Sequence, residues 1–563
     1  MNKEHFNKNS IHTAIVVIML LAGALRLIGL DNFPNAMYSD EISQGYNAYS
    51  VLKTGKDEYG TFIPISFRSF GDWKPPMQAY LMVPTIGLFG LNAWGVRLPS
   101  AILGTFTVYI VFLLVRELIS YINKDTYLEK YKDTIALFAS MYVTISPWHI
   151  LQSRSAMLVV VALFFFCLGF YTLLKSKSKP NLLFVSSVSF SLCIYSYYGM
   201  RVIVPLFLIG CAVWLKHELF RRWKHVVGAV VVGFILLLPL LFGFIFQPDV
   251  VFGRARTVSV FYDKGVSLRV ADLIAQDGPE FPSLAARYFH NKPYHYLIDI
   301  ARRFLQHVDG TYLFLKGDFY DPFQIPGMGI LYLIDGLLIA IALFFLTQKD
   351  KKMLIMLVLL MVLALIPASL TFVTPSTNRT FNAVLPISII VGTGLAFLLK
   401  GKKISHRIGL VIVGVYVLSF SYFSYQYFWQ LPYSYAHWWH YGYKELFQAL
   451  KARENSYDHI IITGQTTVSY VFQLFYQKID PATLNDAIVR NYQADAFGFE
   501  HVDAVGKYEY PRHFDWKVDR DRVPKGALLA AQSRFIIEGG VKELERIYYP
   551  DGKLAYTLYE KTE

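Results

Sequence analysis

Long apolar runs recur along most of this 563-residue chain, and they constrain its fold more than any other feature. About 20 consecutive apolar residues in a helix cross the hydrocarbon core of a bilayer. Only 17% of the residues are charged, whereas soluble domains average about a quarter. We therefore predict a polytopic α-helical membrane protein with about eleven transmembrane helices. The expected spans are 11–30, 97–118, 133–146, 156–174, 181–197, 201–215, 225–246, 327–347, 353–373, 380–399 and 408–428.

The short loops between alternate spans are rich in Lys and Arg, and this bias predicts the orientation of the protein. The basic loops are 175–179, 216–225, 348–352 and 400–407, which we expect in the cytoplasm. The net charge of +13 is concentrated there, so it indicates topology and not a nucleic-acid surface. The three cysteines, at 167, 193 and 211, lie in apolar runs and form no disulfide or metal-binding pattern.

Two long loops and the C-terminal tail then face outward. We divide the chain into a membrane domain, 1–429, and an extracytoplasmic domain, 430–563, in which charges are frequent again. In the tail, "DHIIITG" predicts a strand and "TTVSYVFQLFYQK" a following helix, which indicates a small α/β domain. The long outer loops of the membrane domain are 31–96 and 248–326.

The first outer loop carries two adjacent carboxylates, Asp40 and Glu41. Segment 40–52 has apolar residues at helical spacing, and segment 75–91 is apolar but broken by a proline. We expect both to form interfacial helices, with Ser39 as the N-cap of the first. Acidic residues are common in a first helical turn, so the pair alone does not indicate a site.

Several cations come from separate segments that the topology places at the outer surface. Each one alone is explained by contact with lipid headgroups. Together, beside a carboxylate, they would bind an anionic lipid headgroup next to a general base. These cations are Arg68, Lys74, Arg97, Arg154, Arg201 and Arg379.

This combination of charges suits the transfer of a sugar from a lipid phosphate. The leaving phosphate needs cations as its negative charge develops. The acceptor hydroxyl needs a base near the sugar carbon that it attacks. The outer loops contain no glycine-rich loop that would hold a nucleotide sugar.

Ordered motifs in 38–104 resemble the protein O-mannosyltransferase and lipid A aminoarabinose transferase superfamily of membrane glycosyltransferases. The chain shows "SDE" (39–41), "KPP" (74–76) and "RLPSA" (97–101) in that order. Four further motifs are similar to a bacterial, dolichyl-phosphate-mannose–protein mannosyltransferase-like branch. They are "SPWHILQSR" (146–154), "YSYYGMR" (195–201), "FLKGD" (314–318) and "PGMG" (326–329).

The resemblance implies a C-type glycosyltransferase fold in a bacterial cell membrane, with an outer active site covered by the interfacial helices. It implies a polyprenyl-monophosphate sugar as donor, a protein, lipid or glycan hydroxyl as acceptor, and inversion at the sugar carbon. Asp40 would be the catalytic base and Glu41 its neighbour. Lys74 and Arg97 would hold the donor phosphate with help from Arg201 and Arg379, and Arg68 and Arg154 are further candidates. Candidate substrate contacts are Tyr46, Asp72, Tyr59 and Tyr197.

Some alternatives stay open. The chain has Leu158 where that branch often has an acidic residue, and Pro322 and Phe323 where it has an Arg-His pair, so a different sugar or acceptor, or reduced activity, would fit. A flippase or binding protein for a lipid-linked sugar would use the same cations without a base. A ligase or polymerase would use a diphosphate donor. The loop 248–326, with "RART" (254–257), either covers the cavity or rests on headgroups. We assign no metal site, but a divalent cation near Asp40 is an alternative.

Overall fold

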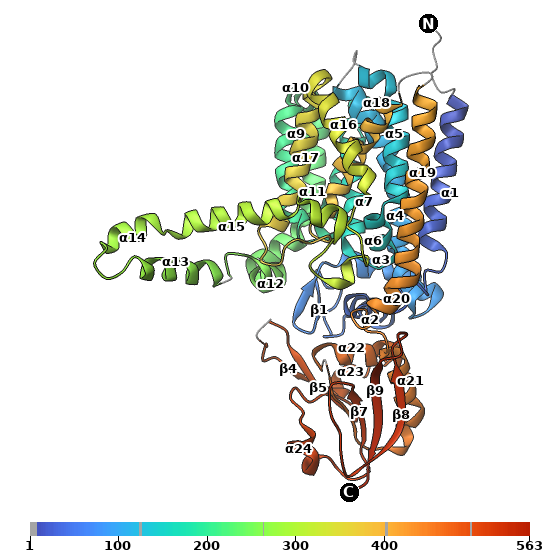
Figure 1. The fold of residues 1–563 in the computed structure, drawn as a ribbon, viewed down its shortest axis with the longest axis vertical. Helices are drawn as coiled ribbons and strands as arrows, with labels where there is room; N and C mark the ends of the chain where they lie inside the picture. Colours follow the sequence, from blue (N-terminus) through green and yellow to red (C-terminus); the bar gives the residue numbers. More distant parts are fainter. Residues whose placement is uncertain (1–7, 123–126, 263, 400–403, 465, 496–497) are drawn as a thin grey trace.

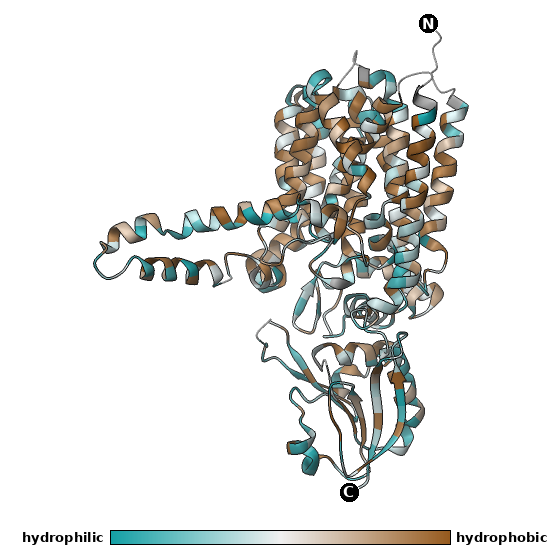
Figure 2. Ribbon diagram, in the orientation of Figure 1, coloured by the Kyte–Doolittle hydropathy of each residue, from teal (hydrophilic) through white to brown (hydrophobic). Residues whose placement is uncertain are grey.

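The computed structural model describes residues 8–122, 127–262, 264–399, 404–464, 466–495 and 498–563. A helical bundle forms one end of the molecule and a small sheet domain the other, and an arm of helices projects sideways between them (Figure 1). Apolar residues dominate the bundle helices, whereas the sheet domain is mixed (Figure 2). This distribution fits a bundle in lipid and a sheet domain in water.

Each of the eleven expected spans contains a helix. Their bounds are α1 (Lys8–Leu27), α4 (Ala93–Ile122), α5 (Tyr127–Ile145), α7 (Leu158–Lys175), α8 (Leu182–Ser196), α9 (Met200–Trp214), α11 (Trp223–Phe246), α16 (Leu333–Lys349), α17 (Lys351–Ser369), α18 (Val384–Leu398) and α19 (Ile404–Tyr425). Among the described residues, seven helices are long and apolar enough to cross a membrane. An eighth span results if α5 is joined to α6 (Pro147–Arg154), from which it is bent by 55°. A 15-residue helix such as α8 is only about 22 Å long, which is short for a crossing.

The described parts of the basic loops lie at the bundle end opposite the sheet domain, together with the start of α1 (Figure 1). Lys175 pairs with Glu117 at 2.8 Å and Lys177 with Glu218 at 3.4 Å, so neighbouring helices are tied together there. Residues 400–403 of the predicted basic loop 400–407 lie outside the described residues. The first long loop, the arm and the sheet domain share the other end.

The first long loop folds into two helices and a hairpin. The helices α2 (Ser39–Thr54) and α3 (Met77–Phe89) confirm the two expected helices, while the hairpin of β1 (Phe67–Ser69) and β2 (Asp72–Lys74) was not predicted. The expected N-cap is wrong by one residue, because α2 begins at Ser39 and the Tyr38 N–H donates to Glu41 Oε2 at 3.0 Å. The Glu41 side chain therefore satisfies an amide that the helix leaves unpaired.

The second long loop supplies α12 (Pro248–Val258) and then the arm. The arm consists of α13 (Gly265–Gln276), α14 (Ser283–Phe289) and α15 (Lys292–Gln306). The end of α12 and the residues after it meet the chain that follows α17. The Val260 N–H donates to the Leu370 carbonyl at 3.0 Å, and the Phe372 N–H donates to the Val258 carbonyl at 2.9 Å. Two segments more than 100 residues apart are thus joined beside the first loop.

The chain after α20 (Leu431–Ser434) forms an α/β domain with a seven-stranded sheet in the order β4-β5-β6-β3-β7-β9-β8. The predicted strand and helix are confirmed as β3 (Ile460–Ile462) and α22 (Thr466–Tyr476). The other strands are β4 (Ile488–Asn491), β5 (His501–Val505), β6 (Tyr508–Glu509), β7 (Leu528–Gln532), β8 (Val541–Tyr548) and β9 (Leu554–Lys561). β3 pairs in parallel with β6 and β7, and the other pairs are antiparallel.

The sheet domain shares a hydrophobic core with the first loop. Ile42 and Tyr46 of α2 belong to the same buried cluster as Phe472 and Phe475 of α22. The contact is close at Gly45, where a Cβ atom would lie 3.0 Å from the Phe475 ring. The sheet domain therefore supports α2 from the side away from the bundle.

Candidate active site

Two carboxylates and two cations lie together at the first turn of α2. They are Asp40, Asp72, Lys74 and Arg254. Lys74 Nζ lies 3.1 Å from Asp40 Oδ1 and 3.3 Å from Asp72 Oδ2. Arg254 Nη1, from α12, lies 3.5 Å from Asp72 Oδ1. The Lys74 side chain is only 5% exposed, whereas Asp40 keeps 40% of its side chain exposed. Asp40 is thus held by an ion pair and still open to a substrate.

The hairpin fixes Lys74 in this position. Its strands pair Phe67 with Lys74 across the ladder, and Ser66 Oγ donates to the Lys74 carbonyl at 2.9 Å. Tyr198, at the turn between α8 and α9, donates to the Trp73 carbonyl at 2.6 Å. The hairpin turn needs Gly71, with φ of +76°, because a Cβ atom there would lie 2.7 Å from the Glu500 backbone nitrogen.

The charges in this group stabilise one another. Burial acts to lower the pKa of Lys74, but Asp40 and Asp72 outweigh it and raise that pKa above its ordinary value. Burial opposes the charge of Arg254 as well, and the same two carboxylates raise its pKa. Both cations therefore stay charged, as a site for an anion requires.

A third cation, Arg379, lies on the loop after α17. Its Nη1 donates to Thr371 Oγ1 at 2.7 Å and to the Val373 carbonyl at 2.8 Å. Burial, helped by the nearby charge of Arg254, lowers the pKa of Arg379. Within the described ranges, no carboxylate forms an ion pair with Arg379, so its charge is available to a ligand. Tyr197 lies within electrostatic range of both arginines.

The same loop is held by Asp318 of the "FLKGD" motif. The buried Asp318 carboxylate accepts from Thr377 N at 2.5 Å and from Thr377 Oγ1 at 2.7 Å. This acidic residue has a positioning role near the site, which the resemblance did not specify.

Glu41 and Arg97 are placed differently from Asp40 and Lys74. Arg97 Nε lies 2.8 Å from Glu41 Oε1, and both side chains are 0% exposed. Arg97 Nη1 also donates to the carbonyls of Leu30 and Pro34, at 3.1 and 2.9 Å. Glu41 Oε1 accepts the Ala156 N–H at 3.0 Å. This geometry leaves neither side chain free to touch a substrate, so it does not fit the phosphate contact expected of Arg97.

Three other predicted cations are also held by protein groups. Arg154 is fully buried and donates to the carbonyls of Leu25 and Gly29 at 2.9 and 2.8 Å. Arg201 donates to the Val251 carbonyl at 2.6 Å and stacks over Tyr198 at 4.4 Å. Arg68 pairs with Glu500 of the sheet domain. These contacts join segments around the site. None of the three arginines forms an ion pair with Asp40.

The candidate substrate contacts divide into two groups. Asp72 and Tyr197 belong to the charged group described above. Tyr46 OH donates to the Ile479 carbonyl at 3.0 Å, and Tyr59 lies under Arg490 at 3.7 Å, so both bind the sheet domain.

Sequence reasoning did not assign roles to Arg254 and His440. Arg254 was visible as part of a basic motif, but nothing local indicated its pairing with Asp72. His440 stacks on Tyr38 with ring centres 5.3 Å apart, and burial lowers its pKa to about 4 against the opposing charge of Asp40. It comes from a loop 400 residues away from Asp40, so no spacing in the sequence could indicate it.

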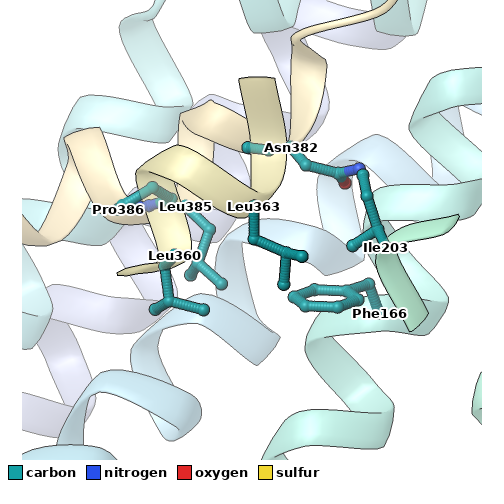
Figure 3. A pocket seen from close by; sticks show the side chains of 8 residues that line it. Phe166, Ile203, Leu360, Leu363, Asn382, Leu385 and Pro386 are labelled. Atoms are coloured by element: carbon teal, nitrogen blue, oxygen red, sulfur yellow. The ribbon is translucent and has the colours of Figure 1, made fainter. Parts of the chain in front are cut away.

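Two cavities lie away from the charged group around Asp40 and Lys74. One, between α7, α9, α17 and α18, has room for about 10 Å³ and is lined by apolar side chains and Asn382 (Figure 3). It has space for one water molecule at most. A larger one, of about 340 Å³, lies at the junction with the sheet domain and is lined by Tyr433, His437 and Tyr549 among others. Across the described residues, no group of three or more His, Cys, Asp or Glu side chains could hold a metal ion.

Comparisons with known proteins agree with the predicted fold. The family profile for dolichyl-phosphate-mannose-protein mannosyltransferases matches residues 73–242. YkcB of Bacillus subtilis, a protein named as a mannosyltransferase, is 23% identical over 227 residues, which are 39% of this chain and 29% of YkcB. The crystal structure of ArnT from Cupriavidus metallidurans bound to undecaprenyl phosphate matches with a TM-score of 0.53 at 12% identity, over 97% of each chain.

The profile match, the similarity to YkcB and the likeness to ArnT support the protein O-mannosyltransferase and aminoarabinose transferase superfamily. The likeness to ArnT over 97% of each chain confirms the predicted C-type fold. The matched segment of this superfamily begins at Trp73, so it includes Lys74 but not Asp40, Arg254 or Arg379. For those three residues the profile match adds no support to the geometry.

Proposed function

We propose that this protein transfers a sugar from a polyprenyl-monophosphate donor to an acceptor hydroxyl, with Asp40 as the general base. The observation that carries the proposal is the Asp40 carboxylate, partly exposed and held 3.1 Å from a buried lysine, beside two further cations. Similarity to this superfamily supports a lipid-linked donor, and ArnT was crystallised with undecaprenyl phosphate. The positive-inside rule supports an extracytoplasmic site in a bacterial cell membrane.

In this mechanism Arg254, Arg379 and Lys74 bind the donor phosphate. Asp40 accepts the proton of the acceptor hydroxyl while that oxygen forms a bond to the anomeric carbon. The bond between that carbon and the phosphate oxygen breaks on the opposite side, which inverts the carbon. The phosphate leaves with one more negative charge, and the cations stabilise that charge.

Asp40→Asn is the decisive variant because it keeps the size of the side chain and removes the base. We expect the rate of transfer to fall by a factor of about 10² to 10⁴ while donor binding is retained. Glu117→Gln, in the exposed pair with Lys175 at the other end of the bundle, is the matched control and should keep full activity. An Asp40→Asn protein that folds and turns over at the normal rate would refute the mechanism.

The assay supplies purified protein in lipid with a set of polyprenyl-phosphate sugars, and mass spectrometry identifies the product. The mass added to a protein, lipid or glycan distinguishes a hexose from a pentose and identifies the acceptor. Movement of the donor across the bilayer without its consumption would indicate a transporter. Repeating the assay in EDTA tests the separate proposal that a divalent cation assists Asp40.

A further inference from the structure

The arm, residues 264–308, leaves the bundle sideways. In Figure 1 it runs across the direction of the bundle helices, with α15 on the side of the bundle and α13 on the side of the sheet domain. Only the C-terminal end of α15 reaches the bundle, where it contacts α17 and the loop that follows. The rest of α15 has α13 on one side and no protein on the other.

The two sides of α15 differ in character. One side packs on α13, whose Val266 and Val270 are buried, and this side also carries the buried pair of Asp299 and Arg303. The opposite side is an exposed stripe at helical spacing, i, i+3, i+4, i+7, i+11 and i+14. The stripe consists of Tyr294, Leu297, Ile298, Ala301, Leu305 and Val308.

The outward side of α13 is different in character. It exposes Arg269, Asp272 and Gln276, which water would solvate, beside the apolar residues Leu268, Ala271 and Ala275. The tip of the arm exposes aromatic and apolar residues beside a basic one, namely Phe281, Leu284, Arg287, Tyr288 and Phe289. An apolar face, a polar face and an aromatic, basic end are the features of helices that lie in a membrane interface.

We propose that the arm lies on the membrane leaflet nearest the sheet domain, with the α15 stripe at the boundary between headgroups and acyl chains. The orientation of the arm favours lipid over a protein partner, because a helix that runs across the direction of the spans lies along the bilayer. The position of α13 fits too, because it places the polar face of the arm on the side of the sheet domain, towards water.

The root of α15 joins this membrane contact to the cations of the site. Arg303 Nε pairs with Asp299 at 2.7 Å, and its Nη1 donates to the Thr371 carbonyl at 3.2 Å. His307 Nε2 accepts the Ser376 N–H at 3.2 Å. Thr371 also binds Arg379 through its hydroxyl, so the arm and Arg379 hold the same loop.

We infer that the depth of the arm in the lipid sets the height of Arg379 relative to the donor phosphate. This second step rests on the proposed function, whereas the membrane contact does not. The two steps can therefore be tested separately.

Site-specific labels test the contact. The three native cysteines are buried, so a single introduced cysteine will react selectively. Leu297→Cys and Leu305→Cys place a fluorophore on the stripe, and Asp272→Cys and Gln276→Cys place the same fluorophore on the polar face of α13. Each protein is reconstituted in nanodiscs of phosphatidylethanolamine and phosphatidylglycerol that contain a lipid with a quencher on its acyl chain.

We expect the two stripe labels to be quenched severalfold more strongly by the lipid quencher than the two α13 labels, and iodide in the water to quench in the reverse order. Equal quenching at all four positions would overturn the membrane contact. Stripe labels that neither quencher reaches would also overturn it, since that result means that protein covers the stripe.

The double variant Leu297→Glu/Leu305→Glu tests the link to the site. We expect it to raise the KM for the donor severalfold in nanodiscs with little change in kcat, while Ala271→Glu/Gln276→Glu on α13 keeps the native KM. An unchanged KM together with the expected quenching pattern would overturn the link alone. A wild-type protein without transferase activity would refute the proposed function, and the quenching result would still decide the membrane contact.

Discussion

Replacing Arg97 by methionine should destabilise the protein severely, because it leaves the Glu41 carboxylate buried without a cation. Both side chains are 0% exposed, so water cannot take the place of the guanidinium. Removing one partner of a buried ion pair costs about 3–5 kcal/mol. The carbonyls of Leu30 and Pro34 lose a donor as well. A native state is stable by only about 5–15 kcal/mol, so the loss is a large fraction of the total.

The unfolding of purified protein in detergent, followed by tryptophan fluorescence, measures the effect. The double variant Glu41→Gln/Arg97→Met removes both charges and should be more stable than Arg97→Met alone. The difference between the sum of the single effects and the double effect gives the coupling energy of the pair. Lys175→Met breaks a partly exposed pair with Glu117 and should cost less than about 1 kcal/mol.

The opposite result is just as informative. If Arg97 binds the donor phosphate, as the resemblance implies, the free energy of unfolding of Arg97→Met will lie within about 1 kcal/mol of the native value. The substitution will then mainly raise the KM for the donor. That outcome would refute the structural role that the burial of Arg97 indicates.

Two further predictions concern charges outside the spans. Burial raises the pKa of Glu58 from 4.5 to about 7, so the folded protein keeps a proton that the unfolded chain releases. Stability should therefore fall by up to about 3 kcal/mol as the pH rises from 4.5 to 7, and Glu58→Gln should flatten this dependence in thermal unfolding at a series of pH values. Arg254→Met should raise the KM for the donor by about a factor of ten, the effect of about 1.4 kcal/mol, while Arg269→Met on the outer face of α13 leaves it unchanged. A donor KM that Arg254→Met does not alter would remove Arg254 from the phosphate site.

The features that the sequence predicts well are local. Apolar runs place the bundle helices, and helical spacing places α2, because each depends on residues within a few turns of one another. The β1–β2 hairpin was missed, although its Gly71 allows the positive φ that its turn requires. Its strands have three residues each, too few to show an alternating pattern.

The assignment of partners to cations could not be predicted. Arg97, Arg154 and Lys74 look alike in the sequence, each a basic residue that the topology places at the outer surface. Packing distinguishes them, since Arg97 and Arg154 face backbone carbonyls inside the bundle and Lys74 faces Asp40 and Asp72. Arg254 depends on a contact between segments about 180 residues apart, which no local pattern records.

The neighbouring carboxylates Asp40 and Glu41 have separate roles because of helix geometry. Successive residues of a helix point about 100° apart, so one can face the core while the next stays partly exposed. Glu41 binds Arg97 of α4 and the backbone of Tyr38, which fixes the first turn of α2 to the bundle. Asp40 is then held at Lys74 by a rigid helix end, with 40% of its side chain exposed. A proton acceptor must stay in one position relative to the sugar carbon, and the buried ion pair one residue away provides that constraint.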